Sequence, residues 1–383
     1  MKKQKNYAAR VLLIEGGTRQ ALPMIYAFKK LNCFVATYNK SKLDVGYASR
    51  YPDKKYKAYF NRDDEDGTYA AVLNVLKTDK YDIVVPLSDF TAIMLSKHKQ
   101  EVSGFAYVAV NDYDVLVYAS DKLKTMRAAA DVGVPMPYTY FDAKCVEDLK
   151  NANYPIVVKP RTGWGSIGFH VVKSYEDLVE LSPDLSAYLA QEYVPQDGVQ
   201  YKCEVYIDRF GEVKSACVFS KLRWYPVDGG SSTLNKTVKN DKIVSDCVKL
   251  LKHLKLYGYG DIDLIEDKRS GAFKIMEINP RVTGSVKICF MAGVNFAEQM
   301  LKDYFNEDVP AYLDYKEGLY LRAFHTDVLW FLKSKNRFKA KPCWFSWRKT
   351  KDQIWSIKDP LPWLTYSIQG VLKYKKEMKK RKR

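Results

Sequence analysis

The stretch 274–281, KIMEINPR, constrains the fold of this chain more than any other. Successive side chains of a strand point to opposite faces, so Glu277 and Asn279 share one face and the apolar residues between them share the other. Pro280 has no N–H to donate to a sheet and ends the strand. A carboxylate beside an amide oxygen suits Mg²⁺. The pattern is equally typical of an edge strand with a solvated polar face, and this stretch alone does not separate the two interpretations.

A second strand with the same alternation, 261–265, precedes it across a short turn. In an antiparallel hairpin, residues separated by an even number can lie on one face, and Asp263 stands fourteen positions before Glu277. Asp263, Glu277 and Asn279 therefore converge in the predicted hairpin. Three hard oxygen ligands on one sheet face, next to basic residues, indicate a site for metal and phosphate.

The N-terminal third alternates apolar strand patterns with helical periodicity, which predicts a parallel sheet covered by helices. Gly16 and Gly17 follow the first strand, but the full G-x-G-x-x-G pattern of a dinucleotide site is missing, which favours a plain tight turn. Strands are predicted at 10–14, 34–37, 82–86 and 105–110, and helices at 21–31, 69–76 and 90–97.

A glycine-rich loop follows a predicted strand at 156–160, whose end carries Lys159. Glycines at 163, 165 and 168 between two strands allow a loop whose backbone N–H groups close over an anion. It is not a Walker loop, because the lysine precedes the glycines and no helix follows. An ordinary glycine-rich hairpin remains an equal interpretation. A further strand is predicted just upstream, at 138–141.

The segment 189–195 reads as a strand that leaves through a hinge bounded by Pro195. Such a hinge can offer backbone groups to the edge of an adenine, although a hinge without a ligand has the same pattern. Strands at 201–207 and 213–219 form a predicted hairpin that ends in a cationic cluster at 220–223. An amphipathic helix follows at 238–254.

Composition restricts the class of protein. With 383 residues, 47% of them apolar, the chain is long enough for two or three packed units. The formal charge is +17, to which residues 373–383 contribute eight basic residues and one acid. Such a charge suits nucleic acid, anionic lipid or acidic small molecules. The seven cysteines show no C-x-x-C pair, which favours reduced thiols in a cytosolic protein.

The C-terminal part combines aromatic and basic residues. Trp344, Phe345, Trp347 and Trp355 lie close together in the sequence, and 364–382 is a predicted helix with a strongly basic end. This combination suits a membrane interface. The alternative is that the tryptophans pack on the body of the protein and the tail is merely solvated. Nucleic-acid binding is disfavoured, because no recognised nucleic-acid module is present.

Taken in order, these elements resemble the ATP-grasp superfamily over residues 8 to 305. The resemblance is to the branch with carbamoyl-phosphate-synthase-like and biotin-carboxylase-like ligases and amino-acid ligases of envelope pathways. It implies an α/β and α+β architecture, with an N-terminal parallel-sheet pre-ATP-grasp domain followed by a two-lobed ATP-grasp fold. The expected domains are the N-terminal domain at 1–118, the small lobe at 119–195, the large lobe with the metal site at 196–316, and an aromatic, basic extension at 317–383.

The resemblance also implies roles for individual residues. Arg223 and Arg281 would steady the transferred phosphoryl group and the acyl phosphate, and the metal ligands would be Asp263, Glu277 and Asn279. Where many relatives have a Glu for the ribose, this chain has Gln200, so the ribose contact is left open. The residues expected to contact ATP are Lys122 and Lys159 at the phosphates, Gly163, Gly165, Ser166 and Gly168 in the covering loop, and Glu192, Tyr193 and Val194 at the adenine hinge.

The implied activity is that of an ATP-dependent carboxylate–amine ligase that releases ADP and phosphate through an acyl phosphate. ATP, one or two Mg²⁺ ions (with Mn²⁺ as an alternative), a small carboxylate and an amine are the expected ligands. A cytoplasmic location, a tail touching the anionic inner face of the membrane, an envelope or surface-polysaccharide pathway and a homodimer are compatible expectations. Two alternatives stay open, namely a carbamoyl- or carboxyphosphate-forming enzyme and a non-catalytic ATP-binding module at a membrane.

Overall fold

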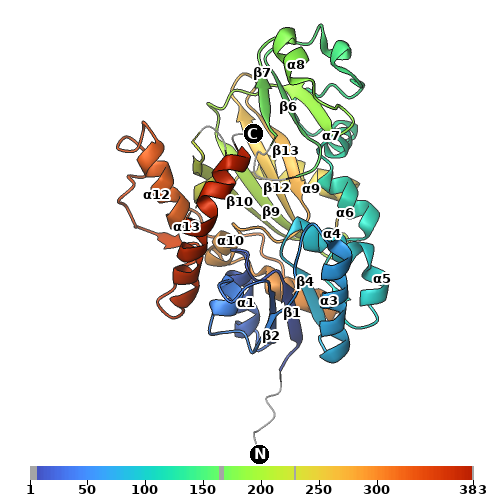
Figure 1. Ribbon diagram of the computed structural model, residues 1–383, viewed down its shortest axis with the longest axis vertical. Coiled ribbons are helices and arrows are strands. Elements are labelled where there is room, and N and C mark those ends of the chain that lie inside the picture. Colours follow the sequence, from blue (N-terminus) through green and yellow to red (C-terminus); the bar gives the residue numbers. More distant parts are fainter. Residues whose placement is uncertain (1–6, 164–167, 228–229, 382–383) are drawn as a thin grey trace, which may run out of the picture.

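The computed structural model of the protein describes residues 7–163, 168–227 and 230–381 and contains three sheets (Figure 1). The N-terminal sheet lies at one end of the molecule, the three-stranded sheet at the other, and a seven-stranded sheet between them (Figure 1). In the described part of the chain, no helix has both the length and the apolar character needed to cross a bilayer.

The first sheet confirms the predicted parallel arrangement, with strand order β3-β2-β1-β4-β5. Its last strand is shorter than the predicted 105–110, because the N–H groups of Phe105 and Ala106 bond to the Val102 carbonyl and close a helix instead. The strands are β1 (Arg10–Ile14), β2 (Phe34–Asn39), β3 (Lys54–Lys57), β4 (Ile83–Pro86) and β5 (Tyr107–Val108). The helices of this part are α1 (Ala21–Lys30), α2 (Val45–Ala48), α3 (Glu65–Thr78), α4 (Asp89–Lys97), α5 (Lys99–Val102) and α6 (Tyr113–Ser120).

The small sheet has the order β7-β6-β8 and is antiparallel. The predicted strand at 138–141 is wrong, since only Thr139 forms a single bridge, to Gln191. The Phe141 N–H bonds back to the Thr139 carbonyl at 3.0 Å, so the chain turns away instead of extending along the sheet. The elements are α7 (Lys122–Asp131), a 3₁₀ turn (Val146–Leu149), β6 (Ile156–Pro160), β7 (His170–Val172), α8 (Tyr175–Leu181) and β8 (Tyr188–Glu192).

The large sheet confirms both predicted hairpins and has the order β13-β12-β9-β10-β11-β14-β15. One face packs its apolar residues against α9 and α7 in a core with Val205, Ile262 and Leu264. The opposite face carries the polar residues of the predicted site. The strands are β9 (Gln200–Ile207), β10 (Val213–Tyr225), β11 (Ser231–Thr237), β12 (Gly258–Asp267), β13 (Ala272–Asn279), β14 (Tyr320–Arg322) and β15 (Thr350–Asp352), and α9 spans Asp241–His253.

The C-terminal segment crosses back onto the N-terminal part, where α13 packs against α2 (Figure 1). The predicted helix at 364–382 is confirmed with slightly earlier bounds, because the turn at Pro360 starts it. Asp359, on that turn, accepts hydrogen bonds from Tyr26 and Ser49 of the N-terminal part. The remaining helices are α10 (Lys287–Ala292), α11 (Phe296–Tyr304), α12 (Phe324–Lys333) and α13 (Leu361–Arg381).

Candidate active site

The polar face of the large sheet brings the predicted metal ligands together. Asp263 on β12 lies directly opposite Glu277 on β13, and Asp261 lies opposite Asn279. Residues paired across an antiparallel ladder share a face, so all four side chains stand on one side. The convergence expected from alternation is therefore confirmed, while the role of these residues as metal ligands stays a prediction.

Two lysines that the prediction did not include form ion pairs with the Asp263 carboxylate. Lys202 lies opposite Asp263 on the neighbouring strand β9, and its ammonium group is 3.0 Å from the Asp263 carboxylate. Lys221 of β10 forms a second ion pair with Asp263. Burial would raise the pKa of Asp263, but the two ammonium groups prevail and lower it to about 2. This face consequently holds a fixed negative charge between two cations.

The donor set fits a magnesium ion that shares its coordination with phosphate. The Asn279 amide nitrogen donates to Asp261 and Asp263 at 3.3 Å each, and one buried oxygen of Asp261 has no hydrogen-bond partner in the described chain. No group of three or more His, Cys, Asp or Glu side chains among the described residues could hold a metal by itself. Mg²⁺ usually takes one or two carboxylates and completes its shell with water and substrate phosphates.

The two predicted phosphate lysines approach this face from α7 and from the small sheet. Lys122, at the start of α7, lies 3.4 Å from the Glu277 carboxylate and donates to the Gly163 carbonyl at 3.0 Å. Lys159 on β6 is only 6% exposed, and burial lowers its pKa to about 8 although the Glu277 carboxylate opposes the shift. The structure therefore places both lysines around Glu277.

The glycine loop begins beside Lys122 and ends where only glycine fits. Gly163 has a φ of +112° and Gly168 a φ of +71°, both in the left-handed region. A Cβ at Gly168 would meet the Pro160 ring at 2.9 Å, so the return strand passes close to the end of β6. The predicted loop residues Gly165 and Ser166 lie outside the described residues.

The hinge residues leave one backbone donor available. The N–H groups of Glu192 and Tyr193 bond to the carbonyls of Tyr138 and Pro155, whereas no group in the described chain accepts from the N–H of Val194. The Glu192 side chain points to the large sheet, where it accepts from Arg269 at 2.9 Å and pairs with Lys274. Glu192 thus connects the two sheets, and the adenine contact of the hinge stays a prediction.

Arg281 follows β13 and is held by the N-terminal part of the chain. Its guanidinium makes a bidentate pair with Asp89 at the start of α4, with N–O distances of 2.8 and 2.7 Å. Burial would lower the pKa of Arg281, but Asp89 outweighs this effect and raises it. The charge of Arg281 therefore persists beside Asn279, whose amide oxygen lies 3.5 Å away.

Arg223 lies in a different environment from the other predicted site residues. It is 2% exposed, pairs with Asp327 of α12 at 3.1 Å, and stacks over the Trp330 ring at 4.7 Å. Within the described chain, none of its contacts is with the polar face. A bulge in β10 separates it from Lys221, which does reach Asp263. These contacts occupy the guanidinium of Arg223. Its expected role, to steady the transferred phosphoryl group, remains a prediction.

Buried Glu204 on β9 supports the segment that follows Arg281. It lies opposite Asp261 and accepts hydrogen bonds from Ser285 at 2.9 Å and Thr283 at 3.2 Å. Burial, reinforced by Asp261, raises the pKa of Glu204 to about 7. The 281–285 segment is thereby fixed to the centre of the sheet.

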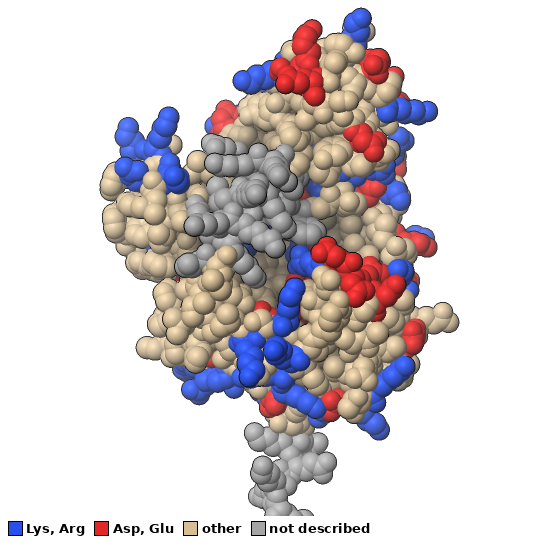
Figure 2. Space-filling view, in the orientation of Figure 1, with Lys and Arg blue, Asp and Glu red and all other residues tan. Residues whose placement is uncertain are grey.

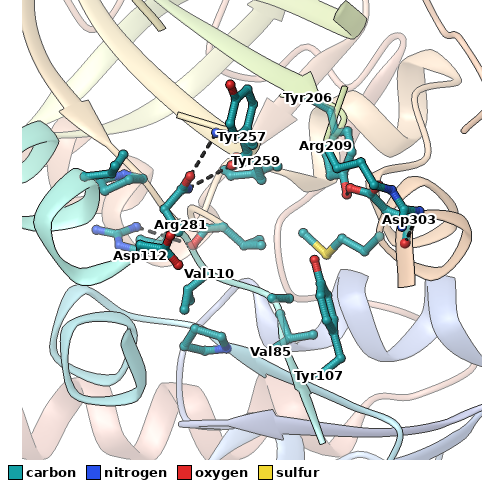
Figure 3. Close-up of a pocket in the computed structure, with 18 of the residues that line it drawn as sticks. Val85, Tyr107, Val110, Asp112, Tyr206, Arg209, Tyr257, Tyr259, Arg281 and Asp303 are labelled. Atoms are coloured by element: carbon teal, nitrogen blue, oxygen red, sulfur yellow. Dashed lines mark hydrogen bonds and ion pairs between the residues drawn. The ribbon is translucent and has the colours of Figure 1, made fainter. Parts of the chain in front are cut away.

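A cavity of about 360 Å³ opens between the first sheet and the large sheet (Figure 3). The ends of β4 and β5 form one wall, and Arg281, Tyr259 and Tyr206 are part of the other. Ligands of parallel sheets bind at the carboxyl ends of the strands, which is where this cavity lies. It connects that edge with the Arg281 end of the polar face.

Alternation along the strands could have identified some of the residues missing from the prediction. Asp261 and Lys202 occupy the same face as Asp263 by simple strand periodicity and pairing. Asp89 carried no comparable signal, because its partner Arg281 is 192 positions away.

Comparison with known proteins identifies one domain within the chain. A family model described as an ATP-grasp domain matches residues 119–285. Residues 119–285 form an ATP-grasp domain. This domain includes Lys159 and the ion pair of Lys122 with Glu277. The chain is 22% identical over 252 residues to D-aspartate ligase of Enterococcus faecium, which covers 59% of each protein. The chain thus spans less than two thirds of that relative.

Solved structures extend the likeness beyond the ATP-grasp domain. Biotin carboxylase from Campylobacter jejuni superimposes with a TM-score of 0.69 at 18% identity, over 82% of this chain and 74% of that chain. L-amino acid ligase from Bacillus licheniformis gives a TM-score of 0.62 at 17% identity, over 79% and 75%. The expected architecture, an N-terminal parallel sheet followed by the ATP-grasp fold, is confirmed.

Proposed function

We propose that the protein is an ATP-dependent carboxylate–amine ligase that works through an acyl phosphate. The observation that carries this proposal is the meeting of Lys122, Lys159 and Glu277 at the start of the glycine loop, over a face that also holds Asp263 and Asn279. Phosphoryl transfer depends on positioning and on neutralisation of charge more than on covalent help from protein. The lysines lie on both sides of a sheet face that carries carboxylate and amide groups, and so can position phosphate and neutralise its charge.

In the proposed reaction, a substrate carboxylate oxygen attacks the γ-phosphorus of ATP, and the bond to the oxygen of the departing ADP breaks. The amine then attacks the carbonyl carbon of the acyl phosphate, loses a proton, and releases inorganic phosphate. Asp263, Glu277 and Asn279 would hold one or two Mg²⁺ ions, which supply neutralisation of the phosphate charge. Lys122 and Lys159 would contact the phosphates, and Arg281 would hold the acyl phosphate.

The cavity beside Arg281 is the proposed place for the carboxylate or the amine. It reaches the predicted acyl-phosphate position and is lined by tyrosines and by the ends of two parallel strands. Similarity to proteins named D-aspartate ligase and L-amino acid ligase supports an amino acid as one substrate. A pathway for envelope or surface polysaccharide, with a cytoplasmic enzyme whose basic tail touches the inner face of the membrane, completes the proposal.

The test is ADP release from ATP and Mg²⁺ with a panel of amino acids and sugar-linked acids, each with and without an amine. We expect release to need both partners, and Glu277→Gln and Lys159→Ala to lower the rate by about 100-fold or more. The exposed pair Lys302 and Glu307 provides matched controls, since Lys302→Ala and Glu307→Gln leave the site untouched. Release driven by bicarbonate alone would indicate carboxyphosphate formation, and ATP binding without turnover would indicate a binding module.

A further inference from the structure

The helix α13 has one face packed on the protein and one apolar face left open. Trp363 and Tyr366 pack against the core that joins the first and large sheets, and Gln369 donates to Asp44 at 3.0 Å. Docking therefore fixes the rotation of the helix. The outward face carries four large apolar side chains spaced along one stripe of the helix, which are Leu361, Leu364, Ile368 and Leu372, exposed by 49%, 54%, 43% and 70%.

Aromatic side chains continue this apolar stripe onto the segment before the helix. The Trp355 ring packs edge-on against Trp363 at 5.7 Å and is still 48% exposed, and its neighbour Ile357 is 84% exposed. Earlier in the extension, Phe331 links Phe338 and Phe345 through ring contacts of 5.5 and 5.7 Å. Packed rings of this kind hold exposed aromatic groups at fixed positions. We call the whole set the C-terminal apolar surface, and its outer members also include Phe338, Phe345 and Trp347.

Basic residues are interspersed in the sequence with members of the C-terminal apolar surface, and no exposed acid accompanies them between 333 and 358. Residues 333–358 contain nine Lys and Arg and one acid, Asp352, which is buried. None of these nine cations forms an ion pair within the described chain, although most lysines of the site and hinge do. Figure 2 shows basic side chains gathered at the outer end of the α12 region, beside a surface largely free of charge. The eleven residues 373–383 add eight more basic residues in the sequence.

We propose that the C-terminal apolar surface docks on an anionic lipid bilayer. Large apolar side chains, tryptophans and unpaired lysines together are the features of an interfacial anchor, since the apolar groups enter the headgroup region and the cations attract anionic lipid. A second copy of the chain would bring two basic surfaces together, which charge repulsion opposes. Nucleic acid would leave the aliphatic stripe of α13 without a partner, because stacking with bases uses aromatic side chains.

This inference extends the proposed membrane contact from the basic tail to a folded surface, and it is independent of the ligase chemistry. The stripe of α13 is oriented by Asp359 and Gln369, which form hydrogen bonds with Ser49 and Asp44 of the N-terminal part. The surface therefore belongs to the folded protein, and removal of the tail alone leaves it in place.

Co-sedimentation of the full chain with vesicles tests the proposal. One set of vesicles contains phosphatidylcholine alone, and the other contains phosphatidylcholine with phosphatidylglycerol. We expect binding to the anionic vesicles only, and a loss of about tenfold or more in the triple variant Leu364→Ser, Ile368→Ser, Leu372→Ser. The matched control replaces three exposed apolar residues elsewhere, Val179, Phe210 and Leu313, with serine and should bind as the natural chain does.

Other outcomes overturn the proposal. Equal binding of the triple variant and the natural chain, or loss of binding only on deletion of 373–383, would show that the tail alone contacts lipid. A concentration-dependent dimer that the triple variant abolishes would assign the surface to a second copy. ADP release in solution, measured on the same variants, reports separately on the ligase activity and on intact folding.

Discussion

The pKa values of single charged groups in the candidate site are set by burial and by charged neighbours on other helices and strands. Asp263 is ionised because Lys202 and Lys221 outweigh its burial, whereas Lys159 is destabilised as a cation because burial outweighs the single carboxylate of Glu277. The two residues differ in the number of opposite charges within reach. A bound phosphate would supply the further negative charge that the Lys159 ammonium group needs as a partner.

The lowered pKa of Lys159 makes nucleotide affinity depend on pH. The ammonium form predominates below about 8 and is lost as the pH rises through that value, so phosphate loses a cationic partner. We expect the Kd for a non-hydrolysable ATP analogue to rise above pH 8, by at most about tenfold per pH unit, because one proton is involved. Fluorescence titration from pH 7 to 10 measures it. Lys159→Met should bind weakly with a flat profile in this range, and an equally steep profile in that variant would assign the titration to another group.

At the scale of elements, the small sheet and the hairpin of β12 and β13 are joined through Glu192. Its carboxylate accepts from the Tyr138 N–H at 2.9 Å and pairs with Arg269 and Lys274 across the hinge. Because these partners come from both sides of the hinge, the ion pairs limit how the small sheet turns over the large one. Lys159 of the small sheet is thereby kept near Glu277.

Weakening this connection should lower stability by a modest amount. Glu192→Gln keeps an acceptor for the Tyr138 N–H but removes the negative charge, and we expect a loss of about 1 kcal/mol in the free energy of unfolding, since the group is partly exposed. Urea unfolding followed by tryptophan fluorescence measures the change. The nearby exposed pair of Asp197 and Lys268 supplies the control, because Asp197→Asn should alter the midpoint very little. Equal effects of the two changes would contradict the assigned role.

At the scale of the whole molecule, the C-terminal extension packs against the N-terminal part of the chain. Asp359 is 1% exposed and receives hydrogen bonds from Tyr26 at 2.9 Å, Ser49 at 2.5 Å and the Arg50 N–H at 3.1 Å. Arg223 and Asp327 tie α12 to the large sheet in the same way. The extension is therefore part of the folded body and connects the first sheet with the large sheet.

Removal of the Asp359 carboxylate should loosen the whole extension. Asp359→Ala leaves three donors without their acceptor, and we expect a loss of about 2–4 kcal/mol in stability. Limited proteolysis should then cut within 317–383 earlier than elsewhere, and denaturant unfolding gives the magnitude. Asp308, 97% exposed at its side chain, is the control position for the same substitution. An unchanged cleavage pattern in Asp359→Ala would show that other contacts hold the extension.

The sequence by itself determined the periodic features. Alternation along 261–265 and 274–281 is enough to place Asp263, Glu277 and Asn279 on one face, because side chains of a strand have a period of two. The parallel N-terminal sheet followed from strands alternating with helices. The basic, aromatic character of the C-terminus was also apparent, and with it the idea of a membrane contact.

Only the tertiary structure decided which partners the charged residues find. Lys221 reaches Asp263 while Arg223 turns to Asp327, because a bulge in β10 interrupts the alternation between them. Likewise, Arg281 meets Asp89 across 192 positions. Side-chain period describes one strand at a time, whereas pairing between distant elements depends on how sheets and helices pack. The shared face of Asp263, Glu277 and Asn279 could therefore be predicted from the sequence, whereas the fold determined which cations lie around it.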